Sequence, residues 1–95
     1  MEPNVAPPAQ AIRVGEWDDI AGGFRVFDGP KWRIKHTTDR GRGTETVISV
    51  VGLQHANGNT LREIIIDCPG TPIVTPAEAR DLARAINAAA DSAEA

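Results

Sequence analysis

The sequence has little of several residue types on which structural and catalytic sites depend. Among its 95 residues there is one cysteine, Cys68, there is no tyrosine, and aromatic residues make up 4%. A single cysteine excludes an internal disulfide and suits a reducing compartment, so we expect a cytoplasmic protein. No apolar run approaches the roughly 18 residues needed to span a bilayer, and the first residues lack the basic and apolar regions of a signal peptide. We therefore expect no membrane partner.

The residues that could carry chemistry do not form a recognisable motif. The two histidines, His36 and His55, and Cys68 match no zinc or iron spacing, so we expect no metal and no cofactor. His36 shares a strand face with Trp32, and Cys68 has the parity of Ile64, which favours packed side chains over a catalytic pair. We predict a protein that is not an enzyme and has no catalytic residue. The alternative, a small enzyme, would need a pocket that holds His36 beside a carboxylate.

Alternating residues and turn signals predict a series of antiparallel strands. The predicted strands are residues 12–17, 24–27, 31–38, 44–55 and 60–68. Asp28-Gly29-Pro30 has the composition of a turn between the second and third of them. Asn57-Gly58 predicts a tight type I′ hairpin between the last two, since both central residues of that turn need positive φ. Short loops between sequential strands indicate a meander.

The C-terminal residues predict one helix. Thr75-Pro76-Ala77-Glu78 has the pattern of a capping box with proline at the first helical position. Apolar residues then recur with helical spacing at Ala79, Leu82, Ala83, Ile86, Ala89, Ala90 and Ala93. The fold class is α+β: an antiparallel β-meander of three to five strands with one C-terminal α-helix packed on one face. Residues 1–11 are expected to form a flexible tail and residues 12–95 a single domain.

The two long strands are apolar on both faces. The first carries Val47, Val51 and Leu53 on one face and Ile48 and Val50 on the other; the second carries Ile64 and Ile66 opposite Leu61 and Ile65. A sheet with one solvated face should alternate between apolar and polar residues. One slim, alanine-rich helix buries too little area for both faces, so the N-terminal segment with Trp17 and Phe24, a second subunit, or both must cover the rest. We expect a homodimer whose interface contains Ile48, Val50, Leu61 and Ile65.

Positive charge is concentrated in residues 25–42, although the whole chain carries −3 and has a pI of about 5.2. The basic residues there are Arg25, Lys31, Arg33, Lys35, Arg40 and Arg42. Lys31, Arg33 and Lys35 would project from one strand face, where they could neutralise the phosphates of a nucleic acid or another anionic ligand. Against this, Trp32 points to the opposite face and cannot stack on bases there. A solvated charged face is the simpler interpretation.

The order of elements resembles that of known small proteins. The residues that carry the resemblance are Trp32-Arg33-Ile34, Gln54-His55-Ala56-Asn57-Gly58 and Thr75-Pro76-Ala77-Glu78-Ala79-Arg80. The layout, over about residues 30–93, is similar to small uncharacterised actinobacterial proteins with a strand meander and an alanine-rich C-terminal helix. A similar order occurs in partial-RNase-H-like antitoxins and in the N-terminal dimerisation domain of a nucleoid-associated protein. We see no separate DNA-binding segment such as either family carries, so we rank a non-enzymatic homodimeric interaction module first. Nucleic-acid or phosphate-ligand binding through the 31–42 strip ranks second.

Overall fold

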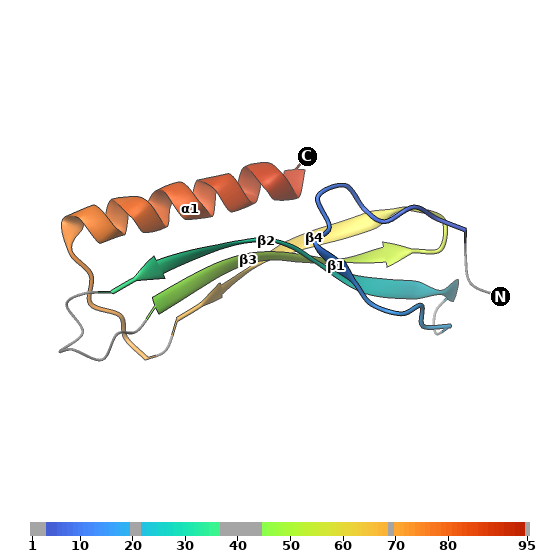
Figure 1. Ribbon diagram of the computed structural model, residues 1–95, viewed down its shortest axis with the longest axis horizontal. Helices are drawn as coiled ribbons and strands as arrows, with labels where there is room; N and C mark the ends of the chain where they lie inside the picture. The colour runs from blue at the N-terminus through green and yellow to red at the C-terminus, as the bar shows by residue number, and fades with distance from the viewer. Residues whose placement is uncertain (1–3, 20–21, 37–44, 69, 95) are drawn as a thin grey trace.

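The computed structural model describes residues 4–19, 22–36, 45–68 and 70–94. These residues form β1 (Arg13–Val14), β2 (Phe24–Lys35), β3 (Glu45–His55), β4 (Thr60–Asp67) and α1 (Pro76–Glu94). The strands make one antiparallel sheet in the order β1-β2-β3-β4, and α1 packs on one of its faces (Figure 1). The predicted α+β meander with a C-terminal helix is confirmed.

Strand β2 runs without a break through the residues at which a turn was predicted. The register shifts between Asp28 and Lys31, where β2 has one more residue than β3. The Gly-Pro pair between them therefore lies in a β-bulge, a position in a sheet that tolerates proline. The predicted turn at 28–30 is wrong, because pairing with β3 overrides the local signal. The extra residue also changes the alternation, so that Phe27 before the bulge and Trp32 after it lie on the same face.

The hairpin between β3 and β4 forms where it was predicted, with a different turn. The Gly58 N–H donates to the His55 carbonyl at 2.9 Å, and the His55 N–H donates to the Asn59 carbonyl at 2.8 Å. Gly58 has a φ of 92°, whereas Gln10 is the one non-glycine residue with positive φ among those described. Asn57 therefore keeps a negative φ, which excludes type I′. The turn is longer than a two-residue loop, and this fixes the register of β4.

The start of α1 follows the predicted capping box. The Glu78 N–H donates to Oγ1 of Thr75 at 3.1 Å, and the Thr75 N–H donates to Oε1 of Glu78 at 2.9 Å. This reciprocal pair satisfies backbone donors that a helix leaves unbonded at its first turn. Along the helix Ala85 and Ala89 are buried, while Ile86 is 37% exposed. The buried stripe is thus rotated from the predicted one, which contained Ile86 and omitted Ala85.

The core lies between α1 and the sheet and is small. Ile48 and Val50 of β3 are buried against Ala85 and Ala89 of α1. Partly buried side chains surround this cluster: Trp32, Ile34, Ile64 and Ala93. The predicted interface is corrected here, because Ile48 and Val50 lie beneath the chain's own helix. They do not share a face with Leu61 and Ile65.

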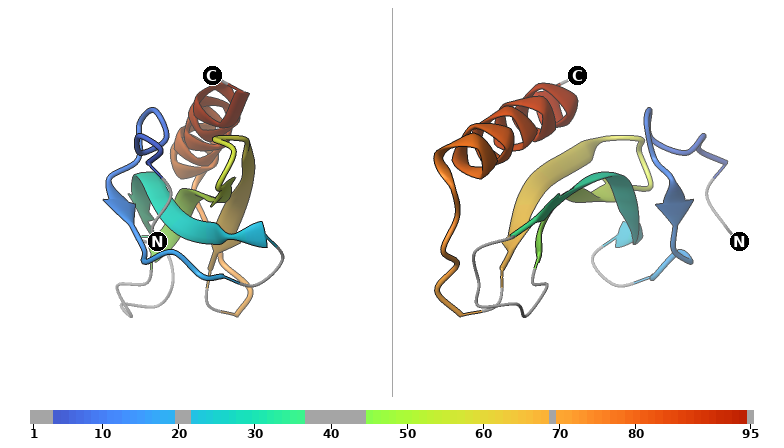
Figure 2. Two further views of the ribbon diagram at one scale, coloured as in Figure 1. Left: turned by 90° about the vertical axis from the view of Figure 1, so that its right-hand side faces the viewer. Right: turned by 60° about the vertical axis from the view of Figure 1, so that its left-hand side comes forward.

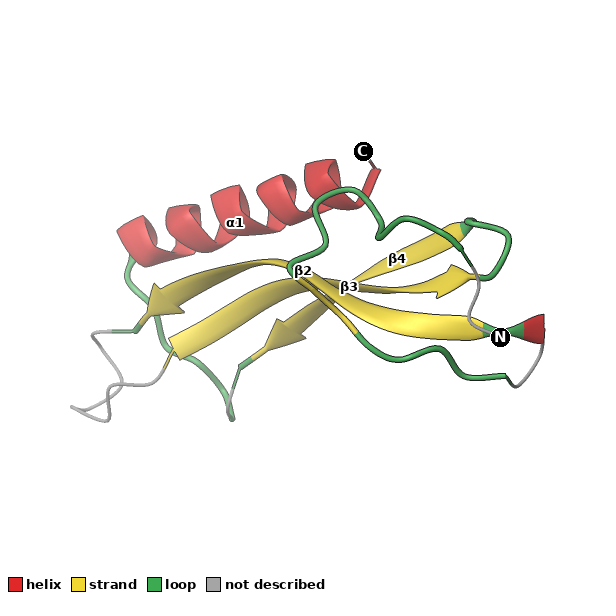
Figure 3. Ribbon diagram, turned by 45° about the vertical axis from the view of Figure 1, so that its right-hand side comes forward, coloured by secondary structure: helices red, strands yellow, loops and turns green. Residues whose placement is uncertain are grey.

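Residues 4–11, expected to form a flexible tail, lie against the sheet on the same side as α1 (Figures 1 and 3). Pro8 is buried. Three side chains of the sheet donate to main-chain carbonyls of this segment: Arg25 to Val5 at 3.2 Å, Gln54 to Ala6 at 2.8 Å and Arg62 to Ala9 at 3.1 Å. Arg25 also donates to Gln54 at 2.8 Å. The helix and the N-terminal segment therefore divide one face of the sheet between them.

The molecule is elongated. Its dimensions are 52 × 23 × 18 Å and its radius of gyration is 16.3 Å, whereas a compact domain of this length has about 12 Å. Figure 2 shows the sheet curving beneath α1. The accessible surface is 6412 Å², against about 5,300 Å² for a compact monomer of the same mass. The chain thus exposes about 1,100 Å² more surface than its mass requires.

Candidate interaction surface

The face of the sheet opposite α1 is the candidate site, and we call it the open face. The strand register places fourteen side chains on it besides the terminal pair Phe24 and His55. They are Val26, Asp28, Lys31, Arg33 and Lys35 of β2, Glu45, Val47, Ser49, Val51 and Leu53 of β3, and Leu61, Glu63, Ile65 and Asp67 of β4. Within the described residues every strand belongs to this one sheet, and α1 lies on its other side. No described helix or second sheet therefore covers the open face.

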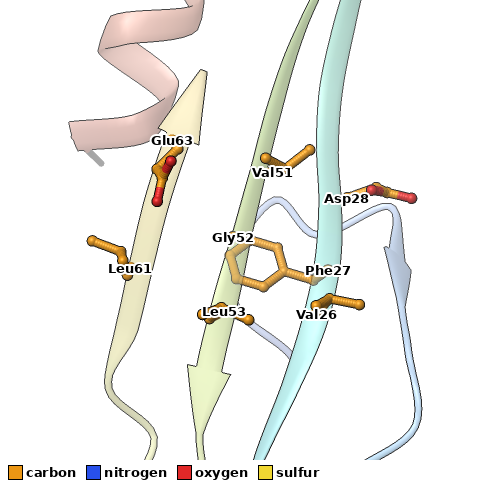
Figure 4. A pocket seen from close by; sticks show the side chains of 8 residues that line it. All are labelled: Val26, Phe27, Asp28, Val51, Gly52, Leu53, Leu61 and Glu63. Atoms are coloured by element: carbon orange, nitrogen blue, oxygen red, sulfur yellow. The ribbon is translucent and has the colours of Figure 1, made fainter. Parts of the chain in front are cut away.

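One end of the open face is apolar. Val26, Leu53 and Leu61 form a single row across three strands, because Leu53 pairs with Val26 on one side and with Leu61 on the other. They border a hollow shown in Figure 4. Val26 is 55% exposed and Leu61 is 52% exposed, and Ile65 farther along β4 is 48% exposed. Large apolar side chains that gather on a surface mark interaction sites more often than isolated ones do.

The other end of the open face is charged along both sides of β3. Arg33, Val47 and Asp67 form one row across the sheet, and Lys31, Ser49 and Ile65 form the next. A second hollow lies among these residues. The cations thus lie on β2 and the acidic residue on β4, with β3 between them. Arg33 additionally makes an ion pair with Glu45, its Nη1 lying 2.7 Å from Oε1.

The predicted basic strip is present in part. Lys31, Arg33 and Lys35 are exposed on one face, with Trp32 on the opposite face as predicted. Arg40 and Arg42 lie outside the described residues. Arg25 is buried on the helix side, where its guanidinium lies 4.4 Å from the centre of the Trp17 ring. The three exposed cations share their face with acidic residues of β3 and β4, so they do not form an uninterrupted basic surface.

The side chains considered for catalysis lie apart from the open face or at its end. Nε2 of His36 lies 2.8 Å from Oγ1 of Thr46, and His36 is 3% exposed. Its imidazole is therefore packed within the protein. Cys68 is a partly buried free thiol, and His55 is exposed at the hairpin end of β3. Among the residues with described positions, no group of three or more His, Cys, Asp and Glu could hold a metal ion.

Two residues of the apolar row, Val26 and Leu53, were not predicted as interface residues. For Val26 the reason is the bulge between Asp28 and Lys31, which joins two predicted strands into one. For Leu53 the reason is the turn at Gly58. A two-residue type I′ loop at 57–58 would pair Leu61 with Gln54, which lies on the face of Ile48 and Val50. The observed loop pairs Leu61 with Leu53. A shift of one residue moves the side chains of β4 to the other face, and only the geometry of the turn could have revealed it.

Comparison of the chain with protein-family models, with curated proteins and with solved structures gave no match. Within the part of the chain that the structure describes, no helix is both long and apolar enough to cross a membrane.

Proposed function

We propose that this protein is a small, non-enzymatic interaction module of the cytoplasm that acts as a homodimer through its open face. The observation that carries the proposal is that Val26, Leu61 and Ile65, each about half exposed, lie on the face that the helix and the N-terminal segment leave uncovered. In a lone monomer these side chains would keep their apolar surface in water, at a cost of about 25 cal/mol per Å² relative to burial.

The amount of exposed surface supports a partner of substantial size. A specific protein–protein interface removes about 800 Å² from each partner. The total accessible surface, 6412 Å² against about 5,300 Å² for a compact monomer of this mass, is spread over the whole elongated chain and is large enough to include an interface of that size. A second copy of the chain offers a face of the same length and the same apolar row, and small domains gain stability from such association.

The placement of the titratable side chains supports a role without catalysis. His36 is buried and bonded to Thr46, while His55 lies at the exposed end of the β3–β4 hairpin. The free thiol of Cys68 is compatible with a reducing compartment such as the cytoplasm.

Light scattering on the purified protein measures its molar mass in solution and so tests the proposal directly. We expect the wild type to be a dimer over a concentration series and the variant Leu61→Asp/Ile65→Asp to be monomeric, because each dimer would bury four unpaired carboxylates. Ile73→Asp is the control: Ile73 is 54% exposed and lies in the loop before α1, outside the strands that form the open face. A monomeric wild type, or a double variant that dimerises like the control, would overturn the proposal.

A second candidate function is the binding of a nucleic acid or a phosphate ligand by Lys31, Arg33 and Lys35. Their exposure on one strand face favours it, and the acidic residues of the same face weigh against it. Titration of labelled DNA and RNA at low salt distinguishes the two candidates. The interaction module predicts no binding. Binding that weakens as salt rises and disappears in Lys31→Glu/Lys35→Glu would favour the second candidate.

A further inference from the structure

Residues 4–11 cross the helix side of the sheet at the end that α1 does not cover (Figures 1 and 3). Val5 lies beside the turn of the β3–β4 hairpin, where its Cγ1 is 3.8 Å from the position that a Cβ on Gly58 would take. At the other end of the segment, the Ser92 hydroxyl near the C-terminus of α1 donates to Oε1 of Gln10. The segment therefore bridges the hairpin turn and the end of the helix.

The sheet beneath this segment carries a set of hydrogen-bond donors directed at it. Arg25, Gln54 and Arg62 donate to the main-chain carbonyls of residues 5, 6 and 9. Arg25 and Gln54 are only 9% and 3% exposed. Nε of Arg25 donates to Oε1 of Gln54 at 2.8 Å, which leaves the amide nitrogen of Gln54 to face the segment. Two of the donors are thus oriented by a contact within the sheet itself.

Aromatic rings hold both guanidinium groups in place. The guanidinium of Arg25 lies 4.4 Å from the centre of the Trp17 ring, and that of Arg62 lies 5.5 Å from the centre of the Phe27 ring. The Phe27 ring reaches across to Gly52 of β3 (Figure 4), where a Cβ would be 2.6 Å from its Cζ. A guanidinium on a ring face keeps N–H groups available for acceptors. The geometry of the three donors is therefore supported by side chains outside the N-terminal segment.

These donors recognise the main chain of the segment, and one proline is buried with it. All three of the bonds end on backbone carbonyls, and within residues 4–11 only Pro8 is buried. Proline suits such a position, because it favours an extended backbone and has no N–H that needs a partner. The matching ligand is an extended segment with carbonyls at positions i, i+1 and i+4 and a proline at i+3.

The chain's own segment is held by few contacts. Five of its eight residues are exposed. Gln10, at its end, has a φ of 66°, in the left-handed region that residues other than glycine seldom adopt. A segment with so little buried surface opens easily. Opening would leave one donor each of Arg25 and Gln54 without an acceptor, and another segment with the same carbonyls would satisfy them.

We propose that Arg25, Gln54 and Arg62 form a binding site for an extended, proline-containing segment of a partner protein, and that residues 4–11 occupy this site when the partner is absent. Recognition of extended proline-containing segments by a prepared groove is a common mode of peptide binding. The tethered segment competes at an effective concentration on the order of millimolar. The site lies on the helix side, so this inference does not depend on the homodimer of the open face.

Peptide binding to the whole chain tests the site. The probe is a fluorescently labelled peptide with the sequence of residues 4–11. In the chain, Pro8→Asp places a charge at the buried position of the segment and should release the segment. We expect the released chain to bind the peptide at least tenfold more tightly than the wild type does, as measured by fluorescence anisotropy. Pro7→Asp is the matched control, because Pro7 is exposed, and should bind like the wild type.

Further variants locate the binding. Adding Gln54→Ala to Pro8→Asp removes the donor to the second carbonyl and should weaken peptide binding about tenfold. A peptide that itself carries Pro8→Asp should not bind the released chain. Amide hydrogen exchange within residues 4–11 should rise in Pro8→Asp and stay unchanged in Pro7→Asp. Circular dichroism checks that each variant folds, and Pro8→Gly, which removes the ring without adding a charge, is a second release variant.

Four results would overturn the site. They are unchanged exchange in both Pro8 variants, no peptide binding to the released chain, equal binding to the wild type and the released chain, and binding that persists undiminished without the Gln54 amide. Exchange of segments between two copies has its own signature. In that case the Leu61→Asp/Ile65→Asp variant would still dimerise and would lose this dimer when Pro8→Asp is added, which would overturn the assignment to a different partner.

Discussion

The two faces of this sheet are built from similar residues and differ in what covers them. On the helix side, Ile48 and Val50 are 0% and 2% exposed beneath α1. On the open face, Leu61 and Ile65 are 52% and 48% exposed. All four are large aliphatic side chains on neighbouring strands. Ile66 of β4 pairs with Ile48 on the helix side and is nevertheless 53% exposed. Burial in this protein therefore depends on which side chains lie directly beneath α1, since neither the residue types nor the face alone decide it.

The helix side also has buried polar side chains, and they hold the N-terminal segment over the end of the sheet that α1 does not cover. Arg25 and Gln54 are buried at the end of the sheet that α1 does not reach, and they bond to carbonyls of the N-terminal segment. A buried polar side chain needs such partners, because an unpaired one costs about 1–3 kcal/mol. This end of the helix side is thus closed by hydrogen bonds to an extended segment, whereas the same end of the open face is apolar.

The largest expected effect is a difference between the two faces in how much an alanine substitution lowers the free energy of unfolding of the monomer. Ile48→Ala should lower the free energy of unfolding by about 2–5 kcal/mol, because it leaves a cavity in a small core. Ile65→Ala, the same chemical change on the open face, should alter the unfolding of the isolated monomer by less than about 1 kcal/mol. Urea denaturation at a protein concentration below the dissociation constant measures both. Equal losses for the two variants would contradict the assignment of the faces.

A smaller effect is expected at the N-terminal segment. Gln54→Ala removes the donor to Ala6 and the acceptor for Arg25, so it should lower the free energy of unfolding by about 1–3 kcal/mol. It should also increase amide hydrogen exchange and proteolytic cleavage within residues 4–11. His55→Ala is the control, since His55 is the next residue of β3 and is exposed. Unchanged exchange in the Gln54 variant would show that these hydrogen bonds do not hold the segment.

The smallest expected effect is at the start of α1. Thr75→Ala removes the capping oxygen that accepts from the Glu78 N–H, which should cost about 1 kcal/mol. Thr75→Ser keeps the hydroxyl and should retain most of that stability. Thermal unfolding followed by circular dichroism compares the two. A loss as large as that of Ile48→Ala would mean that the cap also supports the core.

The elements that were predicted correctly depend on contacts close in the sequence. The capping box joins Thr75 and Glu78, three residues apart, and the Asn57-Gly58 hairpin is equally local. The alternation of Lys31, Trp32 and Arg33 likewise fixes which of them share a face. These signals defined the fold class and the exposed part of the basic strip.

The features that were missed depend on contacts distant in the sequence or on one residue of register. Pairing with β3 turns the Gly29-Pro30 signal from a turn into a bulge. The carbonyls of residues 5 and 6 meet Arg25 and Gln54, 20 and 48 residues away, and nothing in a proline-rich segment predicts that. The added residue in the loop at Gly58 moved Leu61 and Ile65 to the face of Leu53, which separated half of the predicted interface from the other half.

The proposed function of this protein requires that its uncovered sheet surface be occupied in solution by another copy of itself. Sedimentation equilibrium of the wild-type chain over a wide concentration range measures the degree of self-association. We expect a mass of twice the 10.1 kDa of one chain, falling toward the mass of one chain on dilution. A mass of one chain at every concentration would contradict the homodimer.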